Sequence, residues 1–564
     1  MGNFATDAIM KVVQFVVGLN HNINIQIIVV SVHILRVFMN KSLYKMKKIF
    51  LLLLMGSFMV LNRIGAQNIS EKPFVYSDDL QMAAKKGDAD AMYKLGICYY
   101  VGKAGAPTII KSDVPFERDY KQAFKYLSKA AGKGSALAMV NLGNIYKSGV
   151  GAPKGKDLKL ALEWYEKAAK NGCADAYVNI AKIYETEQAG LITGKIVKFK
   201  VKDAQNAAWT LWAKSVEYNK LAAEKGSAIG AYNLGVAYKM GLIGLAIDYQ
   251  ESVRWFQRAA ETGYKRAAND LAVCYMIGMG IPQNKHAALD LMRMAAMEDE
   301  PMSLHNIGAY YYNGIGLPKD QEKALYFFFR AQQMGYNNSK AITECYQAGL
   351  HGASSYATEQ EWQAALKLEY STLPMPAIEI PQPQKMYTAV AGDVVNDCGS
   401  WTILDKEGVW ITDHRYDMIT QDPSSGKLTA ILYGLSTTLA EDGSEEKPIL
   451  EQMLNGLEGD NNSQTVYSKS LQLLQADYDN TLGYRAMAYY NMAVYYHNND
   501  MGAIAELYLK KSLEVDPEFT AAKEDLALIQ KEAKRKQKAA RREQRALLWQ
   551  CITTGLAGVS DILG

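Results

Sequence analysis

An internal repeat of about 36 residues constrains the fold of this chain more than any other feature. The motif Ala-x-x-aromatic/Leu-x-x-x-Ala-Ala-x-x-Gly recurs six times with the same internal spacing and a few single-residue departures. The copies are Ala123–Gly134, Ala161–Gly172, Ser215–Gly226, Ser252–Gly263, Ala288–Asp299 and Ala324–Gly335. A repeat of this length is one supersecondary unit that must stack on its neighbours, because a single copy cannot bury its apolar face alone.

A second pattern follows the closing residue of each copy, and Gly87 begins the first of these patterns. Eight residues on comes Leu-Gly or a near equivalent, and four residues later a Tyr. The apolar positions are Leu95, Leu142, Ile180, Leu234, Leu271 and Ile307, and the tyrosines are Tyr99, Tyr146, Tyr184, Tyr238, Tyr275 and Tyr311. These spacings predict a pair of antiparallel helices. Small residues let the two backbones approach, and glycine ends the second helix, where a left-handed conformation costs least.

The repeat is similar to that of the Sel1-like family, a relative of the tetratricopeptide repeats, and the similarity covers residues 79–370. It implies an all-α, right-handed α-solenoid that binds other proteins and displays side chains of the first helix of each pair on its concave face. Two insertions, Lys103–Arg118 and Gln188–Asn206, depart from the 36-residue unit. We expect both to loop out of one face as partner-specific features.

Three regions with different predicted structures follow the repeats. Residues 371–384 hold four prolines and predict a stiff extended linker. Residues 385–462 are expected to form a small β-containing or irregular region, with a hairpin of Trp401–Leu404 and Gly408–Thr412. Residues 463–533 resemble one or two tetratricopeptide units. The residues that carry this second resemblance are Tyr489, Met492, Ala493, Tyr496, Ala505, Leu509 and Pro517.

Residues 534–564 are expected to form a basic helix and an amphipathic tail. Lys531–Arg545 holds eight basic and two acidic residues, and apolar residues recur at helical spacing through Ala546–Gly564. Two interpretations stay open: a helix that caps the last repeat, or a surface helix that makes peripheral contact with anionic lipid or a partner.

Residues 1–66 have the pattern of a leader and signal peptide. Met46-Lys47-Lys48 precedes an apolar run from Ile49 to Leu61, and small residues follow at Gly65-Ala66. We expect Met46 to be the true start and the mature protein to be exported to the bacterial envelope, either periplasmic or secreted. The alternative is a membrane anchor through an uncleaved N-terminal segment that includes residues 1–45.

Charge and composition narrow the class of partner. The chain has 62 Lys and Arg against 59 Asp and Glu, a net charge of +3, which is too balanced for a general nucleic-acid binder. Without residues 1–66 the balance is 55 − 58 = −3, and since Lys531–Arg545 contributes +6, the remainder carries −9. The predicted partners are therefore proteins, and no nucleic acid is expected.

Several segments resemble catalytic or ligand-binding motifs, but each lacks a residue or a spacing that the site requires. Gly151–Asp157 resembles a phosphate-binding loop, but it lacks the first glycine and the closing Ser or Thr. Cys398 and His414 lie only 16 residues apart, far less than a papain-like pair requires. Asp477 and Asp479 begin a calcium loop that Leu482 breaks. The histidines that would remain after cleavage do not pair at metal-ligand spacing; they are His286, His305, His351, His414 and His497.

The cysteines do not predict a disulfide framework. Cys98 and Cys274 occupy the same helix position in repeats that are not neighbours, and Cys173 and Cys345 also lie in non-adjacent repeats. Only neighbouring repeats touch in a solenoid, so we expect these thiols to be unpaired. No catalytic, cofactor-binding or metal residue is assigned, and the partner-binding residues are not identified at this stage.

The sequence therefore predicts a non-catalytic protein–protein interaction scaffold or adaptor, and not an enzyme. The alternative is a hydrolase acting on cell wall or β-lactams, an activity that the resemblance to cysteine-rich Sel1-like proteins implies. The sequence offers no cluster of metal ligands for that chemistry.

Overall fold

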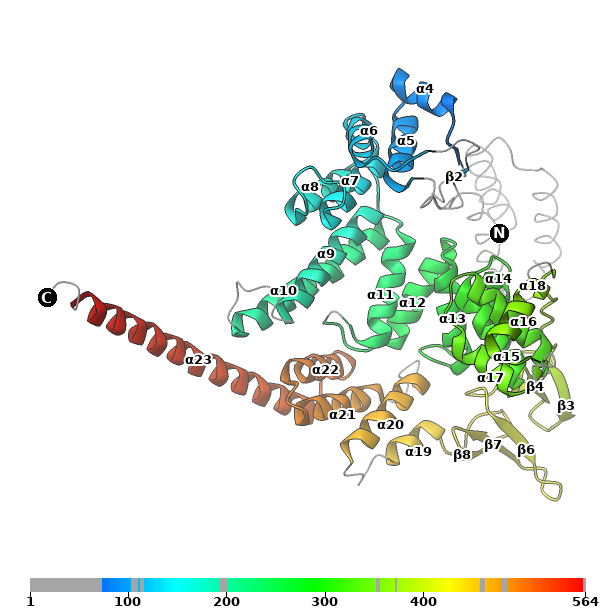
Figure 1. Ribbon diagram of the computed structural model, residues 1–564. Coiled ribbons are helices and arrows are strands. Elements are labelled where there is room, and N and C mark those ends of the chain that lie inside the picture. The colour runs from blue at the N-terminus through cyan, green and yellow to red at the C-terminus, as the bar shows by residue number, and fades with distance from the viewer. Residues whose placement is uncertain are drawn as a thin grey trace, which may run out of the picture. The chain divides into compact units, whose positions relative to one another are not determined.

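The computed structural model describes residues 74–102, 110–111, 116–192, 201–242, 244–350, 356–370, 373–456, 462–477 and 484–560 (Figure 1). The predicted leader and signal peptide lie outside these residues. Among the described residues, no helix is both long and apolar enough to cross a membrane.

Successive helix pairs, each packed on the next along the chain, make up the first part of the structure. We call the first helix of a pair the A helix and the second the B helix. A short helix, α4 (Asp78–Lys86), precedes them. The pairs are α5 (Ala89–Val101) and α6 (Tyr120–Gly132), α7 (Ala136–Ser148) and α8 (Leu158–Lys170), α9 (Asp175–Ile192) and α10 (Val201–Glu224), α11 (Ala228–Met240) and α12 (Tyr249–Glu261), α13 (Lys265–Ile277) and α14 (Lys285–Ala296), α15 (Pro301–Asn313) and α16 (Gln321–Gln333), and α17 (Ser339–Gln347) and α18 (Glu359–Tyr370). The predicted α-solenoid is confirmed.

Glycine sets the distance between the two helices of a pair. A Cβ atom on Gly143 of α7 would lie 2.5 Å from the ring of Tyr165 on α8, and one on Gly235 of α11 would lie 2.5 Å from the ring of Phe256 on α12. Each glycine therefore makes room for an aromatic ring of the facing helix. Both rings are fully buried as a result.

The loops between the A and B helices of the first, second, fourth, fifth and sixth pairs each end on an Asp or Asn that caps the B helix. Asp157 accepts a hydrogen bond from the backbone N–H of Leu160, and its own N–H donates to the carbonyl of Tyr146 at the end of α7. The equivalent caps of the other pairs are Asp119, Asp248, Asn284 and Asp320. An N-cap side chain satisfies donors that the helix leaves unpaired, so these residues fix where each B helix begins.

The second insertion, Gln188–Asn206, differs from the expectation that both insertions loop out. In the third pair, α9 continues to Ile192 and α10 already begins at Val201, so most of Gln188–Asn206 lengthens the two helices. The physical reason is a missing stop signal: Glu187 stands where Gly102, Gly149 and the other pairs have the glycine that ends the A helix. In the first insertion, β2 (Ile110–Lys111) pairs in parallel with β1 (Phe74–Val75).

Two small antiparallel sheets follow the solenoid. β3 (Gln384–Thr388), β4 (Asp393–Asp397) and β5 (Ser400–Leu404) form one, and β6 (Met418–Gln421), β7 (Leu428–Leu432) and β8 (Leu435–Leu439) form the other. A common apolar core that includes Val394, Ile403, Tyr416 and Ile419 joins the sheets, and we call them together the β unit. The expected hairpin is present: Leu404 bridges Trp410, and the backbone N–H groups of Asp405 and Ile411 donate to the carbonyls of Val409 and Ile403. The other edge of β5 pairs with β4.

Helices return after the β unit: α19 (Ile449–Asn455), α20 (Ser463–Ala476), α21 (Tyr484–Asn498), α22 (Gly502–Val515) and α23 (Thr520–Ser560). The helices α21 and α22 pack on each other, as the tetratricopeptide spacing predicts. The basic segment Lys531–Arg545 continues the helix before it, as expected, because α23 is one continuous helix of 41 residues.

Candidate functional site: the A-helix face

A row of polar side chains runs across the A helices. The residue just before the buried Leu or Ile of each A helix is Lys94, Asn141, Asn179, Asn233, Asp270 or Asn306. We call these six residues the A-helix row. All except the buried Asp270 are half-buried. One polar side chain therefore recurs at the same place in six successive pairs, at the boundary between core and solvent.

Hydrogen bonds within each A helix orient the first amides of the row. The side-chain nitrogen of Asn141 donates to the carbonyl of Leu137 at 2.9 Å, and that of Asn179 donates to the carbonyl of Asp175 at 3.2 Å. Donation to a carbonyl four residues back directs the amide along its own helix. Such an oriented amide is a suitable group for hydrogen bonding to a partner's backbone.

Later members of the row connect neighbouring pairs. Asp270 on α13 accepts from the Tyr232 hydroxyl at 3.0 Å and pairs with the Lys239 ammonium at 3.2 Å, and both of those residues lie on α11. Asn306 on α15 donates to the side-chain oxygen of Asn269 on α13 at 2.9 Å. The row therefore joins the A helices of the fourth, fifth and sixth pairs and preorganises this face.

Two lysines lie on the A helices of the second and third pairs. Lys147 on α7 and Lys182 on α9 interact electrostatically, and burial together with Lys182 lowers the pKa of Lys147. Lys182 is 64% exposed and pairs with Glu185 at 2.9 Å. This exposed ion pair beside the row of amides offers a partner segment both a hydrogen-bond donor and an acceptor.

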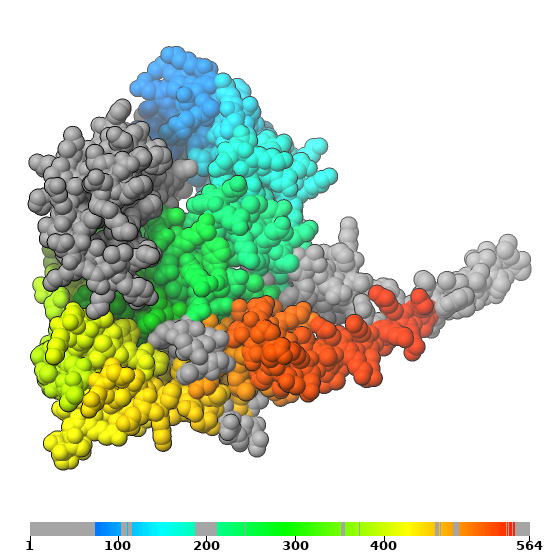
Figure 2. Space-filling view, turned by 180° about the vertical axis from the view of Figure 1, so that it is seen from behind, coloured from blue at the N-terminus to red at the C-terminus, as the bar shows by residue number. Residues whose placement is uncertain are grey.

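The loops between the A and B helices of the later pairs are covered by the C-terminal helices. The Tyr508 hydroxyl on α22 lies 3.4 Å from the backbone nitrogen of Ile247, and the Lys511 ammonium lies 2.6 Å from the carboxylate of Asp248. Buried apolar residues of α11–α13 and α20–α23 form one core. In Figure 2 the orange helices lie against the green pairs.

The β unit covers the next loops of the same edge. The Lys285 ammonium donates to the carbonyl of Gly399 at 3.0 Å, and the Ser400 hydroxyl donates to the side-chain oxygen of Gln283 at 3.2 Å. Cys398, at the tip between β4 and β5, is buried in the same core as Leu289 and Leu317. The loop edge of the fourth to sixth pairs is thus occupied by the chain itself, whereas the A-helix row is not part of either contact.

In the structure, the motifs that resemble catalytic or ligand-binding sites have ordinary structural roles. Asp157 of the phosphate-loop-like segment caps α8. Burial raises the pKa of the Cys398 thiol to about 12, which is opposite to what a nucleophilic cysteine needs. His305 lies between the rings of Phe328 and Tyr336, and burial lowers its pKa.

Metal and disulfide sites are likewise not formed by the described residues. These residues contain no group of three or more His, Cys, Asp or Glu side chains that could hold a metal ion. The five described cysteines, Cys98, Cys173, Cys274, Cys345 and Cys398, are unpaired. Asp479 and His351 lie outside the described residues.

Stacked helix pairs that repeat one pattern define a helical-repeat protein. The Sel1 repeat model matches residues 89–135, 136–173, 228–264, 265–300 and 301–336. Residues 89–173 and 228–336 therefore consist of Sel1 repeats. The third pair, with its lengthened helices, falls between the second and third of these matches.

Relatives with similar sequences match over part of their length. The ERAD-associated E3 ubiquitin-protein ligase component HRD3B of Arabidopsis thaliana is 31% identical over 103 residues, which are 18% of this chain and 16% of that protein. Chitin synthase regulatory factor 3 of Schizosaccharomyces pombe is 26% identical over 296 residues, which are 52% of this chain and 29% of that protein. The chain therefore spans less than a third of the length of either relative.

Among solved structures, a Sel1 repeat protein from Oxalobacter formigenes is similar at 26% identity. It superposes with a TM-score of 0.35 and covers 44% of this chain and 94% of that one.

Proposed function

We propose that this protein is a non-catalytic adaptor that binds protein partners along its A-helix row and acts after export to the bacterial envelope. The observation that carries the proposal is the row itself, since a polar side chain recurs at the same position in six pairs and takes no part in the contacts of the loop edge described above. The names of two relatives, a ligase component and a regulatory factor, support action through other proteins.

Site-specific photo-crosslinking tests the location of the partner surface. A photoreactive amino acid is placed on the A-helix face at Lys182 or Ile229, and on B helices at Glu163 or Arg254 as the matched control. All four side chains are exposed. We expect protein adducts from the A-helix positions in cells. Adducts from the B-helix positions alone would place the partner elsewhere and contradict the proposal.

The export part of the proposal rests on the apolar run after Met46 and is tested separately. N-terminal sequencing of protein recovered from the cell envelope or medium should begin at or near Gln67. Protein that is recovered with residues 1–45 attached would contradict a cleaved signal and favour the anchored alternative. A turnover assay with a β-lactam and with purified cell wall should detect no product, since the proposal assigns the protein no hydrolase activity.

A further inference from the structure

The helix α23 carries a stripe of positive charge. Between Lys531 and Arg545 it has eight basic and two acidic residues, a net charge of +6. At about 100° per residue, seven of the eight cations fall within one arc of about 120°. They are Lys531, Lys534, Arg535, Lys538, Arg541, Arg542 and Arg545. Both acidic residues, Glu532 and Glu543, fall outside that arc, so the charge is concentrated on one face, which we call the basic stripe.

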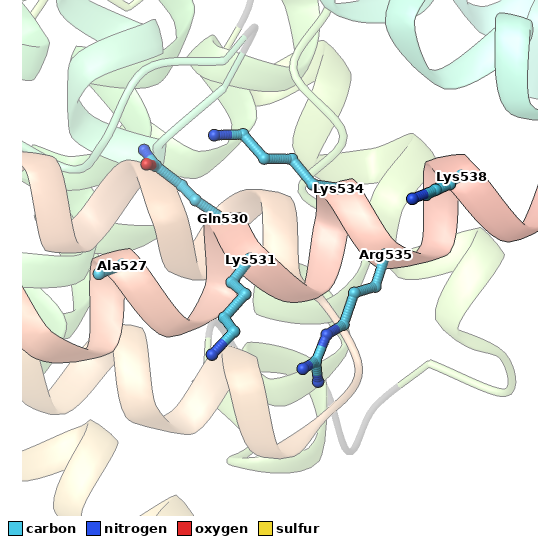
Figure 3. Close-up of a pocket in the computed structure, with 6 residues that line it drawn as sticks. All are labelled: Ala527, Gln530, Lys531, Lys534, Arg535 and Lys538. Atoms are coloured by element: carbon cyan, nitrogen blue, oxygen red, sulfur yellow. The ribbon is translucent and has the colours of Figure 1, made fainter.

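The basic stripe does not contribute to packing of the fold. Ala522 and Ile529 are the buried residues of α23, and Leu526 is packed beside them. By the same helical spacing these three residues lie roughly opposite the stripe. The seven cations of the stripe are exposed. Figure 3 shows part of this surface, where Lys531, Lys534, Arg535 and Lys538 border a shallow hollow. All the residues that line the hollow belong to α23, so it is a stretch of helix surface and not a cleft.

Apolar positions continue the same stripe toward the C-terminus. The backbone of α23 is helical to Ser560, and Trp549, Ile552, Leu556 and Val559 fall within the arc that holds the cations. By helical spacing, the sequence thus aligns a basic segment with an apolar, Trp-containing segment along α23. A polybasic segment joined to an amphipathic helix matches an anionic bilayer, where phosphates meet the cations and acyl chains meet the apolar residues.

We propose that the basic stripe and the apolar positions that follow it form a docking surface for an anionic phospholipid bilayer. A nucleic acid would match the charge but would leave the apolar continuation without a role. The inference is independent of the adaptor function, because it uses no residue of the A-helix row.

Vesicle flotation of the full chain tests the proposal. The vesicles are phosphatidylcholine with about 30% phosphatidylglycerol, and pure phosphatidylcholine. The measured quantity is the difference in binding between the two, so apolar attachment by any other segment cancels. We expect binding to the anionic vesicles that weakens steeply as sodium chloride rises from about 0.05 to 0.5 M. Equal binding to both vesicles, or binding to neither, would overturn the proposal.

A triple variant locates the contact. Lys534→Gln, Lys538→Gln and Arg542→Gln remove three cations of the stripe, and glutamine retains helix propensity. Each cation beside an anionic surface strengthens binding about fivefold, so we expect binding about a hundredfold weaker. The matched control, Lys121→Gln, Lys125→Gln and Lys129→Gln, has the same i, i+4, i+8 spacing of exposed lysines on α6. Equal losses in the two variants would show a nonspecific charge effect and overturn the assignment.

A third comparison separates lipid from other polyanions. The full chain and the stripe variant are titrated with a single-stranded oligonucleotide under the same salt conditions. Stripe-dependent binding to the oligonucleotide without vesicle binding would assign a nucleic-acid partner and overturn the lipid assignment. Trp549→Ala should leave oligonucleotide binding unchanged and reduce vesicle binding, since only a bilayer uses the apolar positions.

Discussion

Single side chains join the solenoid to the C-terminal helices. Asp248 accepts a hydrogen bond from the backbone N–H of Glu251 as the N-cap of α12, and its carboxylate also pairs with Lys511 of α22. The pair is largely buried, with Lys511 21% and Asp248 8% exposed. A carboxylate in this position has two roles, since it begins a helix and anchors the C-terminal helices.

Replacing Lys511 with Met should therefore weaken the docking of the C-terminal helices. The buried carboxylate of Asp248 would lose its cation, which costs about 1–3 kcal/mol. Urea unfolding measures the loss, and hydrogen exchange should localise it to α21 and α22. Lys510→Met is the control, because Lys510 is 54% exposed and makes only an i,i+4 pair with Glu506. An identical response of the two variants would mean that the Asp248 pair does not contribute to docking.

The buried cysteine thiols allow a second prediction about single residues to be tested. Burial raises the pKa of Cys98, Cys345 and Cys398 to about 12, so at pH 8 the folded protein holds roughly a thousandfold fewer thiolates at these positions than the unfolded chain. Iodoacetamide should alkylate them only after unfolding, and the half-exposed Cys173 should react first. Mass spectrometry of the unreduced protein gives the extent of labelling. Rapid labelling of Cys398 in the folded protein would reopen the hypothesis of a reactive thiol.

At the scale of secondary-structure elements, the sequence predicts the repeated helix pairs and misses features that occur in only one pair or one contact. The helix pairs follow from alanine and glycine spacing because close approach admits few other residues, as Gly143 against Tyr165 illustrates. The lengthened third pair was missed, although Glu187 in place of a glycine was a readable signal. The A-helix row was also missed, because half-buried asparagines carry no hydrophobic periodicity. The contacts of Tyr508 and Gly399 with the solenoid could not be predicted, since they join segments without a shared local pattern.

Ala168 of α8 is fully buried at a position where the repeat keeps a small residue in every copy. Ala168→Leu adds three heavy atoms to a packed core, which costs about 1–3 kcal/mol. Stability in a solenoid is close to a nearest-neighbour sum, so the second to fourth pairs should lose protection first. Hydrogen exchange resolved by segment is the measurement. Uniform loss of protection, extending to α21 and α22, would indicate one cooperative unit in place of a stacked array.

For the whole molecule, buried acidic groups predict sensitivity to alkali. Burial raises the pKa of Tyr249 and Tyr310 from 10.0 to about 12 and that of Cys274 from 9.0 to about 12. The unfolded chain therefore releases these protons at a lower pH than the folded protein. The stability that they contribute is complete below about pH 9 and is lost as the pH rises toward 12.

Urea unfolding at pH 7.5, 9.5 and 10.5 measures this loss. We expect the midpoint to change little up to pH 9 and to fall steadily above it. Thermal unfolding at the same pH values gives an independent readout. A midpoint that is constant to pH 10.5 would show that these groups titrate in the folded protein as they do in the unfolded chain.

The covered loop edge has a consequence for how the chain reaches its native state. Ile247 and Tyr508 contact each other although 261 residues separate them in sequence. The first pairs can mature as soon as they emerge from the ribosome or translocon, because their contacts are local. The loop edge of the fourth to sixth pairs stays uncovered until the last third of the chain has been synthesised. During that interval it is an open surface to which a chaperone, or a second nascent chain, can bind.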